Sequence, residues 1–149
     1  MKEIVATRKV AYKPDVVFAT ARQVTRYPDV MPNLDNVVIV KDEGNGTQVS
    51  KWDATFSVGP LKKSITWTER DHWNEAGLNC RFELVEGDMK GYDGTWAFTP
   101  DGDGTMIELR VNFELGMALM GPMIDNIVNQ LMQQNCDELL EAIEKLAGG

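Results

Sequence analysis

The residues best suited to chemistry lie in two strand-like segments, 66–71 and 91–98. The first segment carries Arg70, with Thr68 two positions earlier. A guanidinium is a fixed cation with several donors in one plane, so it is able to hold a carbonyl or enolate oxygen. Within a strand, Arg70 is either an outward solubilising residue or a buried donor for a polar group of a ligand.

Strand alternation leaves both possibilities for Arg70 open. Neighbouring side chains in a strand point to opposite faces, so Arg70 shares a face with Thr66 and Thr68, whereas Ile65 and Trp67 share the other. If the bulky pair faces the interior, Arg70 points to solvent. A β-bulge near the strand end would reverse this parity and turn Arg70 inward.

Large aromatic side chains recur along the strand-like segments, and methionines are frequent near residue 120. Aromatic rings in strands either fill a core or line a cavity for a flat apolar ligand. Methionine is flexible and polarisable, which suits an adaptable apolar surface. The predicted ligand-binding residues are Tyr27, Trp52, Trp67, Phe82, Tyr92, Trp96, Phe98, Met120, Met123, Ile124 and Ile127.

Other chemistries find little support in the residue pattern. His72 is the single histidine, so any Ser-His-Asp or Cys-His arrangement depends on it, and its place beside a turn favours a surface residue. A zinc site would need a histidine or cysteine cluster. Asp101–Gly104 resembles the start of a calcium loop, but glycine and glutamate are missing at the later positions. The sequence predicts no metal and no cofactor.

Composition limits the class of protein and its partners. A length of 149 residues suits one domain, 1–149, with its own core. A net charge of -8 argues against a nucleic-acid partner, which requires a basic face. The first ten residues show no secretory signal, and no apolar run reaches the roughly 18 residues of a membrane span. We therefore expect a cytoplasmic protein with reduced Cys80 and Cys136, of undetermined oligomeric state.

The order of the expected elements gives the fold class. Residues 3–12 predict a first strand, Pro14-Asp15 opens a helix, and the prolines of 27–32 allow a second short helical turn. Turn signals then separate six further strands. These strands are expected at 37–41, 47–58, 61–72, 78–86, 89–99 and 105–115.

The C-terminal segment changes to a helical pattern. After Gly116, apolar residues recur at spacings of three and four, which predicts one helix from about Pro122 to Leu146. One curved antiparallel sheet closed by a long helix makes a container. The expected fold is therefore α+β, with a cavity between the sheet and the C-terminal helix.

Ordered segments of the chain resemble a known family. They are Tyr27-Pro28-Asp29-Val30-Met31-Pro32, Trp67-Thr68-Glu69-Arg70-Asp71, and Gly94-Thr95-Trp96-Ala97-Phe98-Thr99-Pro100 followed by Gly104-Thr105. The set resembles the polyketide cyclase/dehydrase and coenzyme-Q-binding branch of the START-like (SRPBCC) superfamily. The resemblance implies a helix-grip fold, with seven antiparallel strands around a long C-terminal helix and two short helices after the first strand.

The same resemblance implies a function. It favours binding of a hydrophobic small molecule, such as a lipid, quinone or polyketide-like compound. The alternative is a polyketide aromatase/cyclase or dehydrase, in which Arg70 and Thr68 are the candidate catalytic residues. A further alternative is a ribosome- or protein-interaction module. These alternatives include both an enzyme and proteins without catalytic activity.

Overall fold

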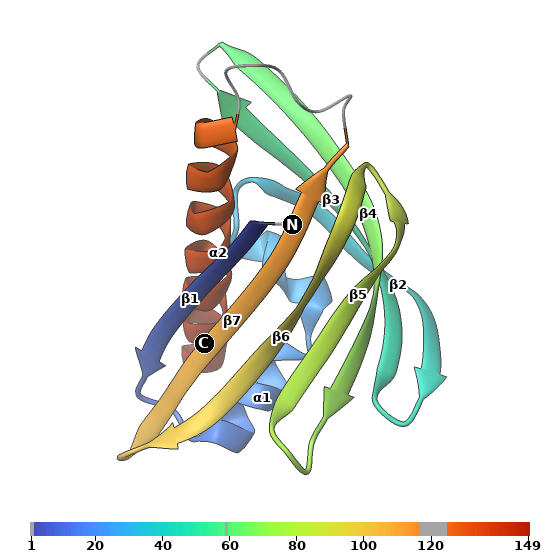
Figure 1. Cartoon of the computed structure of the whole chain (residues 1–149). Coiled ribbons are helices and arrows are strands. Elements are labelled where there is room, and N and C mark those ends of the chain that lie inside the picture. The colour runs from blue at the N-terminus through green and yellow to red at the C-terminus, as the bar shows by residue number, and fades with distance from the viewer. Residues whose placement is uncertain (1, 59, 117–124) are drawn as a thin grey trace.

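The computed structural model describes residues 2–58, 60–116 and 125–149. Its seven antiparallel strands form one sheet in the order β1-β7-β6-β5-β4-β3-β2 (Figure 1). The strands are β1 (Lys2–Val10), β2 (Leu34–Gly44), β3 (Thr47–Val58), β4 (Leu61–Asn74), β5 (Asn79–Gly87), β6 (Met89–Asp101) and β7 (Gly104–Leu115).

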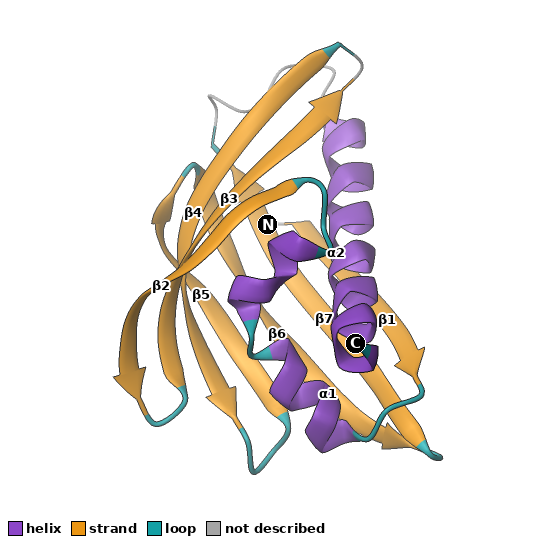
Figure 2. Ribbon diagram, turned by 180° about the vertical axis from the view of Figure 1, so that it is seen from behind, coloured by secondary structure: helices purple, strands orange, loops and turns teal. Residues whose placement is uncertain are grey.

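Three helical segments cover one face of this sheet, as Figure 2 shows from behind. They are α1 (Pro14–Ala21), the 3₁₀ helix η1 (Val24–Asp29) and α2 (Asp125–Gly148). The predicted helix-grip fold is confirmed, including the two short helices after the first strand. The predicted helix start at Pro122 lies outside the described residues. Within them, α2 continues two residues beyond the predicted end at Leu146.

Several strand bounds differ from the predicted ones, most in β2, which runs to Gly44 rather than to Lys41. β1 ends at Val10 rather than Tyr12, and the Tyr12 carbonyl accepts a hydrogen bond from Thr105 Oγ1 at 2.7 Å. β2 begins at Leu34, three residues before the predicted start, since Leu34 already pairs with Ala54 of β3. Pairing with a neighbouring strand therefore extends β2 through residues that carry little strand signal of their own.

Asn45 and Gly46 form a tight hairpin turn. Both residues have positive φ, 55° and 83°, and they join β2 to β3 where Gly44 pairs with Thr47. Such a two-residue turn matches the twist of the flanking strands. A Cβ on Gly46 would lie 2.3 Å from the Trp73 carbonyl oxygen, so the neighbouring strand also requires glycine here.

The core lies between the concave face of the sheet and α2. Alternate residues of β7 form its floor, with Ile107, Leu109 and Val111 at most 1% exposed. From α2, Leu140 and Ile143 are equally buried in the same core. This burial of apolar area is the main stabilising term, and it fixes which residues of each strand face inward.

Candidate functional site

A small cavity lies between the sheet, η1 and α2. Its volume is about 20 Å³, which is enough for about one water molecule. β4 contributes four alternate residues to the cavity wall, namely Trp67, Glu69, Asp71 and Trp73. The remaining lining residues are Val24, Tyr27, Met31, Leu34, Trp52, Phe82, Tyr92, Trp96, Leu109, Asn135 and Leu139.

Seven of the fifteen residues that line the cavity are aromatic. All four tryptophans of the chain line it. The Trp52 and Trp67 rings are stacked, with centroids 5.7 Å apart and planes inclined by 11°. Tyr92 contacts Trp67 and Phe82 at centroid distances of 5.6 and 5.2 Å. The wall therefore presents several flat, polarisable faces to whatever occupies the cavity.

Two carboxyl groups interrupt this aromatic wall. Glu69 is 5% exposed and Asp71 is 2% exposed. Trp67 Nε1 donates to Glu69 Oε1 at 2.8 Å, and Ser50 Oγ donates to Asp71 Oδ2 at 2.8 Å. Trp52 Nε1 in turn donates to Ser50 Oγ at 2.8 Å. The two acids are thus held in place by neutral donors from β3 and β4.

The two carboxyl groups influence each other's protonation. Burial raises the pKa of Glu69 well above its usual value, and the charge of Asp71 and a hydrogen bond to Asp71 raise it further. Burial also raises the pKa of Asp71, while hydrogen bonds from Glu69 and Ser50 oppose the rise. Of the two, Glu69 therefore favours the protonated form, in which it donates a hydrogen bond to Asp71.

Trp73 supplies an unsatisfied donor at the same cavity. Its side chain is 5% exposed, and its Nε1 has no hydrogen-bond partner within the described part of the chain. An unpaired buried donor costs free energy that an acceptor would recover. A ligand oxygen or a water molecule in the cavity would fit this position.

Asn135 of α2 connects the cavity to the surface. It lines the inner cavity and also an outer pocket of about 220 Å³ between β3 and α2. Asn33, just before β2, donates through Nδ2 to Asn135 Oδ1 at 3.3 Å. Asn135 is thus the lining residue that the outer pocket and the cavity share.

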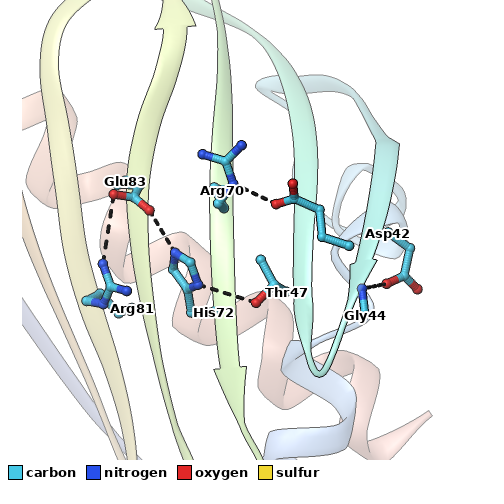
Figure 3. A network of polar contacts seen from close by, with 8 residues as sticks. Asp42, Gly44, Thr47, Arg70, His72, Arg81 and Glu83 are labelled. Carbon is cyan, nitrogen blue, oxygen red and sulfur yellow. Dashed lines mark hydrogen bonds and ion pairs between the residues drawn. The ribbon is translucent and has the colours of Figure 1, made fainter.

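The structure places the two candidate catalytic residues away from the cavity. Arg70 Nε pairs with Glu43 Oε1 at 2.6 Å on the outer face of the sheet. Figure 3 shows Arg70 in a surface network, with α2 behind the strands. On the same face, the His72 ring pairs with Glu83 Oε1 at 2.7 Å. Thr68 is buried, but it has the strand parity of Arg70 and does not line the cavity.

The predicted ligand-binding residues divide into three groups. Those that line the cavity together are Tyr27, Trp52, Trp67, Phe82, Tyr92 and Trp96. Phe98 is buried beside the site, stacked on Trp96, and half-buried Ile127 is not a lining residue. Met120, Met123 and Ile124 lie outside the described residues.

Sequence reasoning missed Glu69, Asp71 and Trp73 as site residues. The signal was present, because all three share the strand parity of Trp67. Placing Trp67 inward therefore places both acids inward as well. Polar character argues against an interior position, which becomes tolerable through the hydrogen bonds that the two carboxyl groups make with each other, Trp67 and Ser50.

The described residues contain no group of three or more histidine, cysteine, aspartate or glutamate side chains arranged to hold a metal ion. Cys80 and Cys136 are both free and buried. None of the described helices is long and apolar enough to cross a membrane.

Comparison with known proteins adds sequence relatives. The profile of the family described as "Polyketide cyclase / dehydrase and lipid transport" matches residues 10–140. A curated relative, the ribosome association toxin RatA of Vibrio cholerae, is 25% identical over 132 residues, which cover 88% of each chain.

Solved structures share the same architecture. A Thermus thermophilus protein, TTHA0849, is 30% identical with a TM-score of 0.89, covering 98% of this chain and 97% of its own. The Zhui aromatase/cyclase of a Streptomyces species is 21% identical with a TM-score of 0.82, covering 99% and 93%. A START superfamily protein of Mycobacterium smegmatis is 17% identical with a TM-score of 0.78, covering 98% and 97%. The last two likenesses concern the fold alone.

Proposed function

Because the chain belongs to the polyketide cyclase/dehydrase and lipid transport family of the START-like superfamily, we propose that it binds a hydrophobic small molecule between the sheet and α2. The observation that carries this proposal is the convergence of four tryptophans and two tyrosines on one cavity. A mostly apolar, concave site with a few convergent polar groups is typical of small-molecule binding. The acid pair would orient the polar end of the ligand.

Binding must widen the site, because a volume of about 20 Å³ admits nothing larger than a water molecule. We place the opening at the Asn33–Asn135 contact, where the outer pocket meets the cavity. Separating this pair requires a shift of α2 relative to the start of β2, not a break in the sheet. The ligand would then sit against the aromatic wall with its polar end at Glu69 and Asp71.

Native mass spectrometry of gently purified protein tests this proposal, together with a thermal-shift screen of lipids, quinones and aromatic polyketides. We expect a bound hydrophobic mass, and stabilisation by the compounds that match it. Leu139→Phe, which adds bulk at the cavity, should abolish both signals. Ile127→Phe, on the same helix but not among the lining residues, should leave them intact. Absence of any bound or stabilising compound would contradict the proposal.

A second candidate is catalysis of ketide cyclisation or dehydration, which the acid pair favours. Burial and the hydrogen bond between them favour a proton on Glu69 beside the Asp71 carboxyl group, so the cavity would offer a general acid and a general base side by side. In this version of the enzyme hypothesis, Asp71 and Glu69 would act in place of Arg70 and Thr68. Assays of the parent protein and of Asp71→Asn with poly-β-ketone substrates test this enzyme hypothesis. It requires that the parent protein cyclises the substrate and that the variant does not.

A third candidate is association with ribosomes, which the RatA relative favours. The net charge of -8 disfavours direct contact with RNA, so a protein component of the ribosome would be the partner. Co-sedimentation with ribosomes at low and moderate salt tests this candidate. A protein that stays in the supernatant under both conditions would exclude it.

A further inference from the structure

The charge and lining of the cavity specify the polar end of its occupant more narrowly. We propose that the ligand is a hydrophobic amine, whose ammonium group sits at Asp71 and whose neighbouring oxygen accepts a hydrogen bond from Trp73 Nε1. This inference rests on the proposed binding function, because it names the ligand class of the same cavity.

The first argument concerns the charge of the site. The lining residues include two acids and no lysine, arginine or histidine. The side-chain hydrogen bonds to Asp71 come from Ser50 and Glu69, which are both neutral. A buried carboxylate without a cation is expensive, and pairing with a cation offsets that cost. An ammonium group on the ligand would provide the positive charge that the cavity wall lacks.

The second argument concerns the aromatic wall. The faces of tryptophan and tyrosine carry negative electrostatic potential, so they attract a cation placed over them. Trp67 stacks on Trp52 and contacts Tyr92, and its own Nε1 holds Glu69. The negative charge of the acid pair and the ring faces therefore attract the same kind of group.

Trp73 gives an independent indication of a ligand. The Trp73 side chain is only 5% exposed, yet its Nε1 has no hydrogen-bond partner within the described residues. An ammonium group cannot accept this hydrogen bond, whereas a hydroxyl, ether or carbonyl oxygen near the nitrogen can. A fatty acid or other carboxylate would satisfy Trp73 but would place a third acid beside Glu69 and Asp71.

Three probes of matched shape test the inference, namely 2-phenoxyethylamine, 2-phenoxyethanol and phenoxyacetate. They share a ring and an ether oxygen, and they differ in the charge of the terminal group. Because all four tryptophans line the cavity, their indole N–H signals in a ¹H–¹⁵N spectrum report binding directly. A fourth probe, 3-phenylpropylamine, lacks the oxygen and should leave the Trp73 signal the least shifted.

We expect the amine to bind at least about tenfold more tightly than the alcohol, as for a close charge pair in a desolvated site, and phenoxyacetate to bind worst. Asp71→Asn should remove the preference for the amine. Glu83→Gln, which removes a carboxylate from the outer face, should preserve it. Circular dichroism checks that both variants fold. If Asp71→Asn does not fold, the order of the three probes in the parent protein decides.

The outcomes separate the two proposals. If none of the probes and no compound of the wider screen perturbs the indole signals, the binding function itself fails. If the alcohol or the carboxylate binds as well as the amine, the proposed binding function is retained and the inference of an amine ligand is overturned. The same holds if folded Asp71→Asn keeps the full preference for the amine.

Discussion

At the scale of single residues, the unusual feature is a carboxyl pair enclosed by indole rings. Most buried acids are neutralised by a basic partner, whereas Asp71 receives its side-chain hydrogen bonds from Ser50 and from protonated Glu69. Trp67 completes the arrangement by donating to Glu69. The pair is thus stabilised by sharing one proton. The free energy of unfolding of the protein must therefore depend on pH.

Glu69→Gln should make the protein more stable at neutral and alkaline pH and flatten its stability profile. The pKa of Glu69 is raised from 4.5 on folding, so its contribution is fully present below about pH 4.5 and is lost as pH rises through the folded pKa. Each unit of the raised pKa is worth about 1.4 kcal/mol. Glutamine cannot ionise, yet it can still donate to Asp71. Urea unfolding between pH 4 and pH 9 measures the effect.

Glu83→Gln is the matched control for this pH profile. The hydrogen bond from His72 lowers the pKa of Glu83, so its contribution is present above its unfolded pKa and is lost as pH falls. The control should therefore change only the acid limb of the profile. If Glu69→Gln lowers stability across the whole range, the proton-sharing description of the pair is wrong.

Strand parity explains what could be predicted at this scale. Plain alternation along β4 placed Trp67 opposite to Arg70, and the structure follows that alternation without a bulge in β4 near Arg70. The irregularity between Thr68 and Glu69 in the β4–β5 pairing places the extra residue, Val85, on β5. The protonation of Glu69 and the unpaired Trp73 Nε1 depend on contacts between strands, which a single sequence does not specify.

At the scale of elements, the turn signals in the sequence predict the strands of the sheet, but they do not predict which strand residues line the site. Clusters of glycine, asparagine and proline separated the predicted strands near their observed limits, because these residues favour backbone angles that strands exclude. β2 begins three residues before its predicted start, since its first residues are strand only through pairing with β3. Which strand faces meet α2 follows from tertiary packing instead.

Gly94→Ala should destabilise the protein by about 1–3 kcal/mol through overpacking. A Cβ on Gly94 would lie 2.0 Å from the Arg110 carbonyl oxygen and 2.4 Å from Phe82 Cζ. The backbone of β6 approaches the Phe82 ring this closely because no side chain intervenes. Thr95→Ala, at the exposed neighbouring position, is the control. Chemical denaturation with equal free energies for the two variants would show that β6 has room to adjust.

Asn135→Ala should open the cavity to small solutes. It removes the Asn33–Asn135 hydrogen bond, with a loss of about 1 kcal/mol of stability. Since every tryptophan lines the cavity, acrylamide quenching of fluorescence should rise in this variant. Gln130→Ala, at an exposed position of α2, is the control. Equal quenching in both variants would move the access point elsewhere.

At the scale of the whole molecule, a single helix closes the concave sheet. α2 packs along β1 and β7, and its buried residues complete the core that begins on the sheet. Polar contacts supplement this packing, since Arg8 of β1 bonds Glu144 of α2 through Nε and Nη2 at 3.1 and 2.8 Å. Two kinds of contact thus hold α2 in place, and they differ in expected strength.

Ile143→Ala and Arg8→Ala compare these contacts directly. Ile143 is fully buried, so its truncation should lower the free energy of unfolding by about 2–5 kcal/mol. Arg8 and Glu144 have side chains 39% and 34% exposed, so the loss of this solvent-screened pair should cost less than about 1 kcal/mol.

Ionic strength separates the two contributions further. The cost of Arg8→Ala should shrink between 10 mM and 500 mM NaCl because salt screens the exposed pair, whereas the cost of Ile143→Ala should stay constant. Urea titrations of both variants at the two salt concentrations measure this difference. An Arg8→Ala loss as large as that of Ile143→Ala, and unaffected by salt, would mean that the ion pair rather than apolar packing holds α2 against the sheet.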